Sequence, residues 1–242
     1  MLTDDCGAIR LSRKHLSLAN GACGVVGIVV LLTWSDSRAL TVACVLVFAA
    51  WGFDSIDGLA ARGLGRPRAV GEVMDSLCDA SSFGVLPAIL VTMHWRALGP
   101  HTIPLGPVLG VAFYCCVVLR LRRYTVHAVA DAPAARTFFQ GLPSPVAAMS
   151  VAAAILAARA GDPALAWSPF VFAAACAPLM VSTIPFKDTP RLAMWLARAL
   201  WPLPVLAAIA FAAGGAATVL VFFAAYLASG ALRLHAPRPS SR

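Results

Sequence analysis

Four aspartates form a dense acidic cluster in an otherwise apolar chain. Asp54 and Asp57 are three residues apart and Asp75 and Asp79 are four apart, so each pair shares one face of a helix. Two antiparallel helices joined by a short loop can therefore present four carboxylates to one another. Such oxygens suit hard divalent cations such as Mg2+ or Mn2+, which bind carboxylate together with substrate phosphate. Two ions about 3.5 to 4 Å apart can clamp phosphate oxygens during an in-line displacement.

The glycines and the arginine beside this cluster fit a phosphate-bearing ligand. Gly58 and Gly71 have no side chain to block the close approach of a backbone or a ligand. Arg62 supplies a planar, permanently charged donor for phosphate. Each residue also has a structural reading, because glycines pack membrane helices and arginines at helix ends extend toward the interface. The joint pattern favours a ligand site, since aspartates in an apolar bundle are costly.

The composition indicates an integral membrane protein. Hydrophobic residues make up 60% of the 242 residues and charged residues only 12%, and the mean hydropathy is +0.81. We expect an all-α, polytopic bundle that forms one membrane domain over residues 1–242. A membrane span needs about 20 apolar residues. The eight expected spans lie near residues 17–34, 38–61, 71–94, 104–122, 143–160, 166–184, 191–213 and 215–233.

The basic residues predict the orientation of these spans. Lys and Arg alternate between rich and poor loops, and sixteen of the nineteen lie on one side. The positive-inside rule then puts both termini and the acidic cluster on the cytoplasmic side of a cell membrane. A nucleotide can reach the cluster from the cytoplasm, while a lipid can enter from the inner leaflet. The net charge of +8 is thus explained by topology, and we expect no nucleic-acid partner.

The segment from Asp54 to Asp79 resembles a known family signature. Its order, D-x-x-D-G-x-x-A-R-x8-G-x3-D-x3-D, is similar at every fixed position to that of the CDP-alcohol phosphotransferases. The resemblance implies a homodimeric membrane enzyme that moves a phosphatidyl-type group from a CDP-linked lipid to an alcohol and releases CMP. It also implies that Asp54, Asp57, Asp75 and Asp79 bind two divalent ions, and that Asp79 accepts the proton of the attacking hydroxyl. The residues assigned to the CDP site are Asn20, Gly58, Ala61, Arg62 and Gly71.

Three further stretches resemble the phosphatidylserine synthase branch of that family. They are Leu16 to Gly24 (similar to L-T-x-x-N-x-x-x-G), Asp79 to Ala88 (similar to D-x-x-S-F-G-x-x-P-A) and Phe139 to Pro145 (similar to F-x-G-L-P-S-P). Each also has a plain structural reading. Asn20, for example, could make an interhelical hydrogen bond instead of binding a ligand.

The acceptor alcohol depends on weaker signals than the reaction does. Residues 120–125 read R-L-R-R-Y-T where the branch shows R-L-A-R-F-N, so Arg120 and Arg123 match but Thr125 replaces an asparagine. Arginines suit the carboxylate of serine, and we expect serine as the acceptor. Glycerol 3-phosphate and inositol phosphate are the alternatives, and a cation transporter is a remote one. The residues assigned to the acceptor site are Ser82, Arg120, Arg123 and Thr125.

Overall fold

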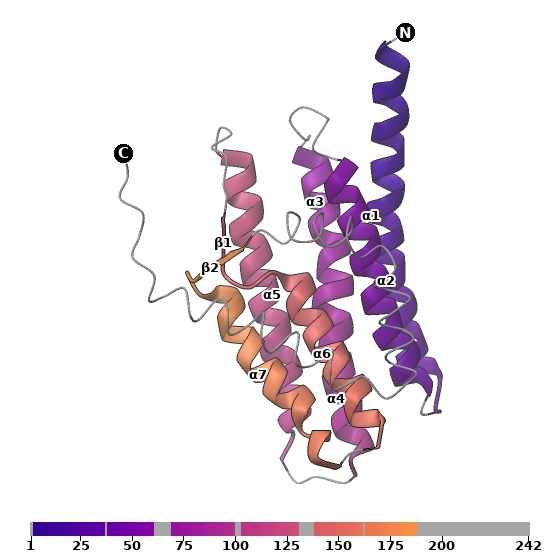
Figure 1. Ribbon diagram of the computed structural model, residues 1–242, viewed down its shortest axis with the longest axis vertical. Coiled ribbons are helices and arrows are strands. Elements are labelled where there is room, and N and C mark those ends of the chain that lie inside the picture. Colours follow the sequence, from indigo (N-terminus) through magenta and orange to yellow (C-terminus); the bar gives the residue numbers. More distant parts are fainter. Residues whose placement is uncertain are drawn as a thin grey trace.

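The described part of the chain is a bundle of helices with a short β ladder (Figure 1). This computed structural model describes residues 2–36, 38–60, 69–99, 103–130, 138–161 and 163–187. The helices and strands, in chain order, are α1 (Leu2–Thr33), α2 (Arg38–Ala60), α3 (Ala69–Asp79), the π-helix η2 (Ala80–Val85), α4 (Leu86–Ala97), α5 (Leu105–Ala130), β1 (Phe138–Gln140), α6 (Ser144–Arg159), the 3-10 turn η3 (Pro163–Leu165), α7 (Ser168–Val181) and β2 (Pro185–Lys187).

Among the residues that the structure describes, five helical segments are long and apolar enough to cross a membrane. They are His15–Thr33, Arg38–Ile56, Val73–Ala97, Leu105–Arg123 and Pro163–Val181. Each coincides with an expected span to within a few residues, which confirms those five positions. The two last expected spans, 191–213 and 215–233, lie outside the described residues.

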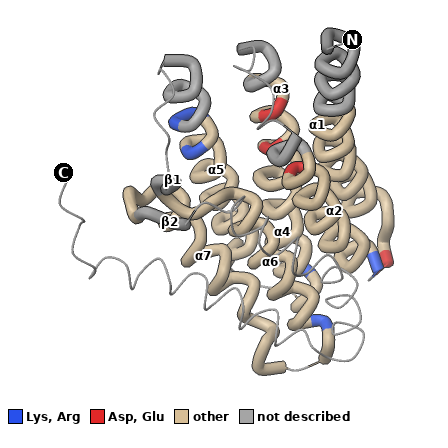
Figure 2. The backbone as a smooth tube through the Cα atoms, turned by 45° about the horizontal axis from the view of Figure 1, so that its top comes forward, with Lys and Arg blue, Asp and Glu red and all other residues tan. Residues whose placement is uncertain are grey.

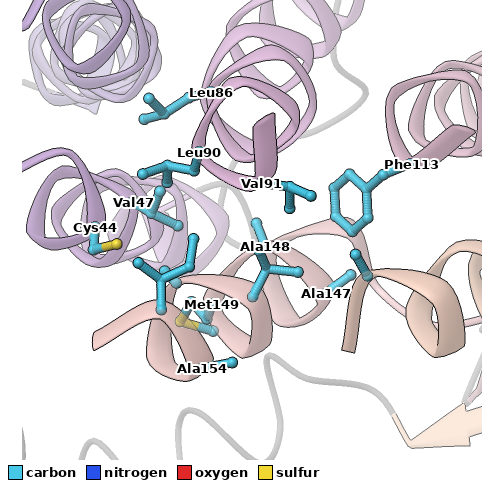
Figure 3. Packing of buried hydrophobic residues seen from close by; sticks show 14 of the residues in the cluster. Cys44, Val47, Leu86, Leu90, Val91, Phe113, Ala147, Ala148, Met149 and Ala154 are labelled. Carbon is cyan, nitrogen blue, oxygen red and sulfur yellow. The ribbon is translucent and has the colours of Figure 1, made fainter. Parts of the chain in front are cut away.

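The expected span at 143–160 forms a helix but is shorter than the other five. α6 has 16 residues, or about 24 Å of helix, against a hydrocarbon thickness of about 30 Å. Every residue from Ser144 to Ala157 is buried, with the exception of Pro145 in the first turn. Figure 3 shows Ala148 and Met149 of α6 near Leu90 of α4 and Val47 of α2. α6 is therefore an inner helix, surrounded by protein on most of its circumference.

A continuous helical segment carries two of the four predicted metal ligands. α3, η2 and α4 follow one another without a break, and the backbone N–H of Leu86 donates to the carbonyl of Ser81, five residues back. Pro87 comes next and cannot donate to the preceding turn. A local π turn is one way in which membrane helices accommodate such a proline.

α1 packs closely against this segment through three glycines. A Cβ atom built on Gly24 would lie 2.7 Å from Ser82 Oγ and 2.8 Å from the backbone nitrogen of Ser82. Built on Gly21 or Gly27, it would meet Cys78 Sγ at 2.8 Å or a Leu86 methyl at 2.7 Å. The three glycines are spaced three residues apart. The residues that they face, Cys78, Ser82 and Leu86, are spaced four apart. Small residues of this kind allow two helix backbones to approach closely.

The β ladder was not predicted from the sequence. β1 and β2 pair antiparallel, with Phe139 opposite Phe186. Next to the ladder, Gly141 has a φ of +81°, and a Cβ there would lie 2.4 Å from the carbonyl oxygen of Met180. The backbone N–H of Gly141 donates to the carbonyl of Ile184 at 2.8 Å. The chain between α5 and α6 is thereby tied to the end of α7.

We expect Gly24→Ala to destabilise the fold. The added methyl meets backbone atoms of η2, which cannot rotate away, so the two helical segments must separate at a cost of about 1–3 kcal/mol. Thermal unfolding of the purified protein measures the loss. Gly52→Ala is the matched control, since a Cβ on Gly52 would meet nothing within 4 Å. Equal unfolding temperatures for the two variants would contradict the packing argument.

Candidate active site

Three of the four predicted aspartates lie close enough at one end of the bundle for their charges to interact. Asp54 is near the end of α2, and Asp75 and Asp79 are on α3; all three side chains are partly buried. Asp79 is repelled by both Asp54 and Asp75 and attracted by Arg120 of α5. Figure 2 shows the acidic residues of this region and the basic residues of α5 at the same end of the molecule. The side chain of the fourth aspartate, Asp57, lies outside the described residues.

Two polar residues of α1 donate hydrogen bonds to the α3 carboxylates. Ser17 Oγ donates to Asp75 Oδ1 at 3.0 Å, and Asn20 Nδ2 donates to Asp79 Oδ1 at 2.9 Å. The donors are one helical turn apart, as are the acceptors, so α1 and α3 meet in register and run in the same direction. The bond from Asn20 confirms that this residue joins two helices, which was the structural reading of its position. Its predicted contact with CDP stays a prediction.

Sequence reasoning missed Ser17, although a signal was present. Ser17, Asn20, Gly24 and Gly27 follow one another at spacings of three, four and three. That spacing marks one stripe along a helix. Two polar residues at one end of a stripe of glycines indicate a helix interface that ends at a polar site.

Ser82 lies inside this interface. Its side chain is 0% exposed, and its Oγ donates to the backbone carbonyl of Asn20 at 2.7 Å. The hydroxyl thus holds α1 against η2. The observed bond shows that Ser82 joins two helical segments. Its expected role in binding the acceptor stays a prediction.

Two arginines of α5 donate hydrogen bonds to residues of α6 and α7. Arg120 Nη1 donates to Ser144 Oγ at 2.8 Å, and Arg123 Nη1 donates to the carbonyl of Val181 at 3.2 Å. Ser144 is 0% exposed and begins α6, directly after the segment that Gly141 ties to α7. The segment from Phe139 to Pro145 therefore helps to place Arg120, a role that the sequence did not reveal. Arg123 is exposed.

The remaining predicted site residues cannot be placed by their side chains. Gly58, Gly71 and Thr125 belong to described helices, but nothing around them is described. Ala61 and Arg62 lie outside the described residues. Their assignments to the CDP and acceptor sites stay predictions.

The described carboxylates fit a hard divalent cation in their chemistry. Asp79 is repelled by Asp54 and Asp75, and carboxylate oxygens are what Mg2+ and Mn2+ prefer. Within the described residues no three Asp, Glu, His or Cys side chains come together closely enough to hold an ion by themselves. The predicted set of four also needs Asp57, whose side chain is not among the described ones.

The arrangement combines a carboxylate with a cationic group beside it at a membrane-embedded site. A carboxylate can accept a proton from a hydroxyl, and an arginine can bind a carboxylate or a phosphate through paired N–H groups. Asn20 also leaves its Oδ1 buried and without a hydrogen-bond partner among the residues that the structure describes. Buried polar atoms of this kind are rare and often mark functional sites.

Comparisons with known proteins bear on this site. The CDP-alcohol phosphatidyltransferase family model matches residues 14–183. A CDP-diacylglycerol--serine O-phosphatidyltransferase of Mycobacterium leprae is 38% identical over 152 residues, which cover 60% of this chain and 49% of the relative. An archaetidylserine synthase of Methanothermobacter thermautotrophicus is 37% identical over 138 residues, covering 56% of this chain and 54% of the relative.

A third relative is more distant but is covered over more of its length. The CDP-diacylglycerol--serine O-phosphatidyltransferase of Bacillus subtilis is 27% identical over 135 residues, 55% of this chain and 69% of the relative. The chain spans about half the length of the first two relatives. The family match includes α1 from residue 14 on, with Asn20, the aspartates of α2 and α3, and Arg120. The chain belongs to the CDP-alcohol phosphatidyltransferase family.

Proposed function

We propose that the protein transfers a phosphatidyl group from CDP-diacylglycerol to the hydroxyl of L-serine, giving phosphatidylserine and CMP. The observation that carries the proposal is the placement of Asp79, which accepts a hydrogen bond from Asn20 and is attracted by Arg120. The family match and the relatives named for serine transfer support the choice of donor and acceptor.

The reaction needs a proton acceptor at the attacking hydroxyl. In the proposed mechanism the Asp79 carboxylate takes the proton of the serine hydroxyl, whose oxygen forms a bond to the lipid-side phosphorus. The bond between this phosphorus and the bridging oxygen breaks, and CMP leaves with the electron pair. Asp79 is suited to this step because it accepts a hydrogen bond from Asn20 of α1 and is attracted by Arg120 of α5.

Arg120 and Arg123 would hold the carboxylate of the serine. Both are on α5, one helical turn apart, and each is anchored to the protein by a hydrogen bond. Such anchoring limits the freedom of a guanidinium before substrate binds, which favours bidentate binding of a planar carboxylate. Thr125 follows Arg123 on the same helix, and its contribution stays a prediction of the sequence.

Divalent metal completes the proposed site. Members of the family use divalent metal ions, and Asp54, Asp57, Asp75 and Asp79 would hold two ions, Mg2+ or Mn2+. Bound ions would neutralise charge on the pyrophosphate and on the departing CMP. Gly58, Ala61 and Arg62 would line the CDP site, as the resemblance implies, and Gly71 is assigned to the same site.

We also propose eight spans with both termini and the active site on the cytoplasmic side. Supporting this, Arg38 begins α2 and Arg96 lies in the last turn of α4, so both are remote along their helices from the aspartates. Arg159, at the end of α6, donates to Thr41 near the start of α2. These three arginines thus occupy the end of the bundle opposite the acidic cluster. The homodimer that the resemblance implies stays a prediction.

Purified protein should release CMP from CDP-diacylglycerol when L-serine and Mg2+ or Mn2+ are present. EDTA should abolish this release, and added Mn2+ or Mg2+ should restore it, because the four carboxylates need cations to hold the pyrophosphate. Chromatography of the labelled lipid product identifies the acceptor. Release with glycerol 3-phosphate or inositol phosphate but not with serine would refute serine as the acceptor while retaining the reaction class.

Asp79→Asn should lower the rate of CMP release by about 10²- to 10⁴-fold, the usual range for loss of a general base. The amide keeps the size of the side chain but cannot take the proton. Steady-state kinetics measure the loss, and thermal unfolding checks that the variant folds. Asp36→Asn is the matched control, because Asp36 is an exposed aspartate between α1 and α2. Full turnover by Asp79→Asn would contradict the assigned role.

Reporter fusions test the orientation. A fluorescent protein fused after Arg242 should fluoresce in bacterial cells, and alkaline phosphatase fused there should be inactive, because the C-terminus is expected in the cytoplasm. Phosphatase inserted after Gly161, between α6 and α7, should be active. The reverse pattern would refute the proposed orientation.

A further inference from the structure

Asn20 is held by the protein on two sides. The residue is 0% exposed, its Nδ2 donates to Asp79 Oδ1 at 2.9 Å, and its backbone carbonyl accepts from Ser82 Oγ at 2.7 Å. Asp79 and Ser82 are three residues apart on the opposite helical segment. The same segment therefore fixes both the backbone of Asn20 and the direction of its side chain.

Only half of the Asn20 carboxamide is satisfied. Its Oδ1 is buried without a hydrogen-bond partner in the part of the chain that the structure describes. A buried amide placed for stability alone would be expected to use both its donor and its acceptor. The side chain is instead directed by its contact with Asp79.

The hydrogen bond from Asn20 gives the Asp79 carboxylate a fixed direction. Asp54 and Asp75 both act on the Asp79 carboxylate with like charge. The terminal torsion of an aspartate is soft, so repulsion alone can turn the carboxylate. A hydrogen bond to Oδ1 opposes that turn and thereby also sets the direction of the second oxygen, Oδ2.

We infer that Asn20 is a positioning residue that holds the Asp79 carboxylate in the orientation in which Oδ2 faces the acceptor hydroxyl. The inference rests on the proposed function and extends it. It differs from the sequence prediction, in which Asn20 contacts CDP. Asn20 acts through Asp79, and Ser82 and Gly24 keep α1 close enough for the bond to form.

Measurements of kcat and KM distinguish a positioning role of Asn20 from a role in CDP binding. Asn20→Ala should lower kcat by about tenfold to a hundredfold, the usual effect of a misplaced catalytic group, and should leave KM for CDP-diacylglycerol within about twofold. Asn20→Asp should lower kcat at least as much, since it sets an acceptor against Asp79. Ser150→Ala is the matched control, because Ser150 is buried and bonded within α6. A raised KM with unchanged kcat would overturn the inference in favour of CDP binding.

A second measurement needs no substrate. Unfolding temperatures of Asn20→Ala, Asp79→Ala and the double variant form a cycle, and contacting residues give non-additive shifts. We expect the double variant to lose less than the sum of the single losses, because each single change leaves the other group buried without its partner. Additive shifts would overturn the inference even if CMP release is observed. Non-additive shifts with no CMP release by the wild type would instead refute the proposed function.

Discussion

The close approach of α1 to the segment α3–η2–α4 is the constraint on which the site depends. Gly21, Gly24 and Gly27 leave no room for a side chain between the two backbones. Interhelical hydrogen bonds reach only about 3 Å between heavy atoms. Without this spacing, Ser17 and Asn20 could not reach Asp75 and Asp79. In an apolar bundle there is little hydrophobic drive to bring helices together, so packing of small residues and polar contacts has to do so.

A second arrangement acts on the same carboxylate from the other side. Gly141 lets the chain before α6 lie directly against the end of α7, where its N–H bonds to Ile184. Ser144 then begins α6 in a position to accept from Arg120, which attracts Asp79. Two remote stretches of sequence, near residues 17–27 and 139–145, thus serve one functional group.

Much of the fold was predictable because apolar length is a strong and local signal. The described membrane-crossing segments lie where continuous apolar stretches predicted them. The departures have non-local causes. The β ladder joins residues 138–140 to residues 185–187, which are far apart in the chain, and α6 can be short because its neighbours cover it. The π turn before Pro87 reflects backbone hydrogen bonding that hydropathy does not report.

The sequence by itself predicted the chemistry: four aspartates at helical spacing, with arginines nearby, favour a site for divalent metal and phosphate. It could not determine how the individual groups are held, because hydrogen bonds between helices depend on distances and rotations that single-helix patterns do not contain. Only the tertiary structure decided that Asn20 donates to Asp79, that Ser82 holds Asn20, and that Ser144 anchors Arg120. The physical reason is that a backbone spacing set by glycines selects which side chains can touch.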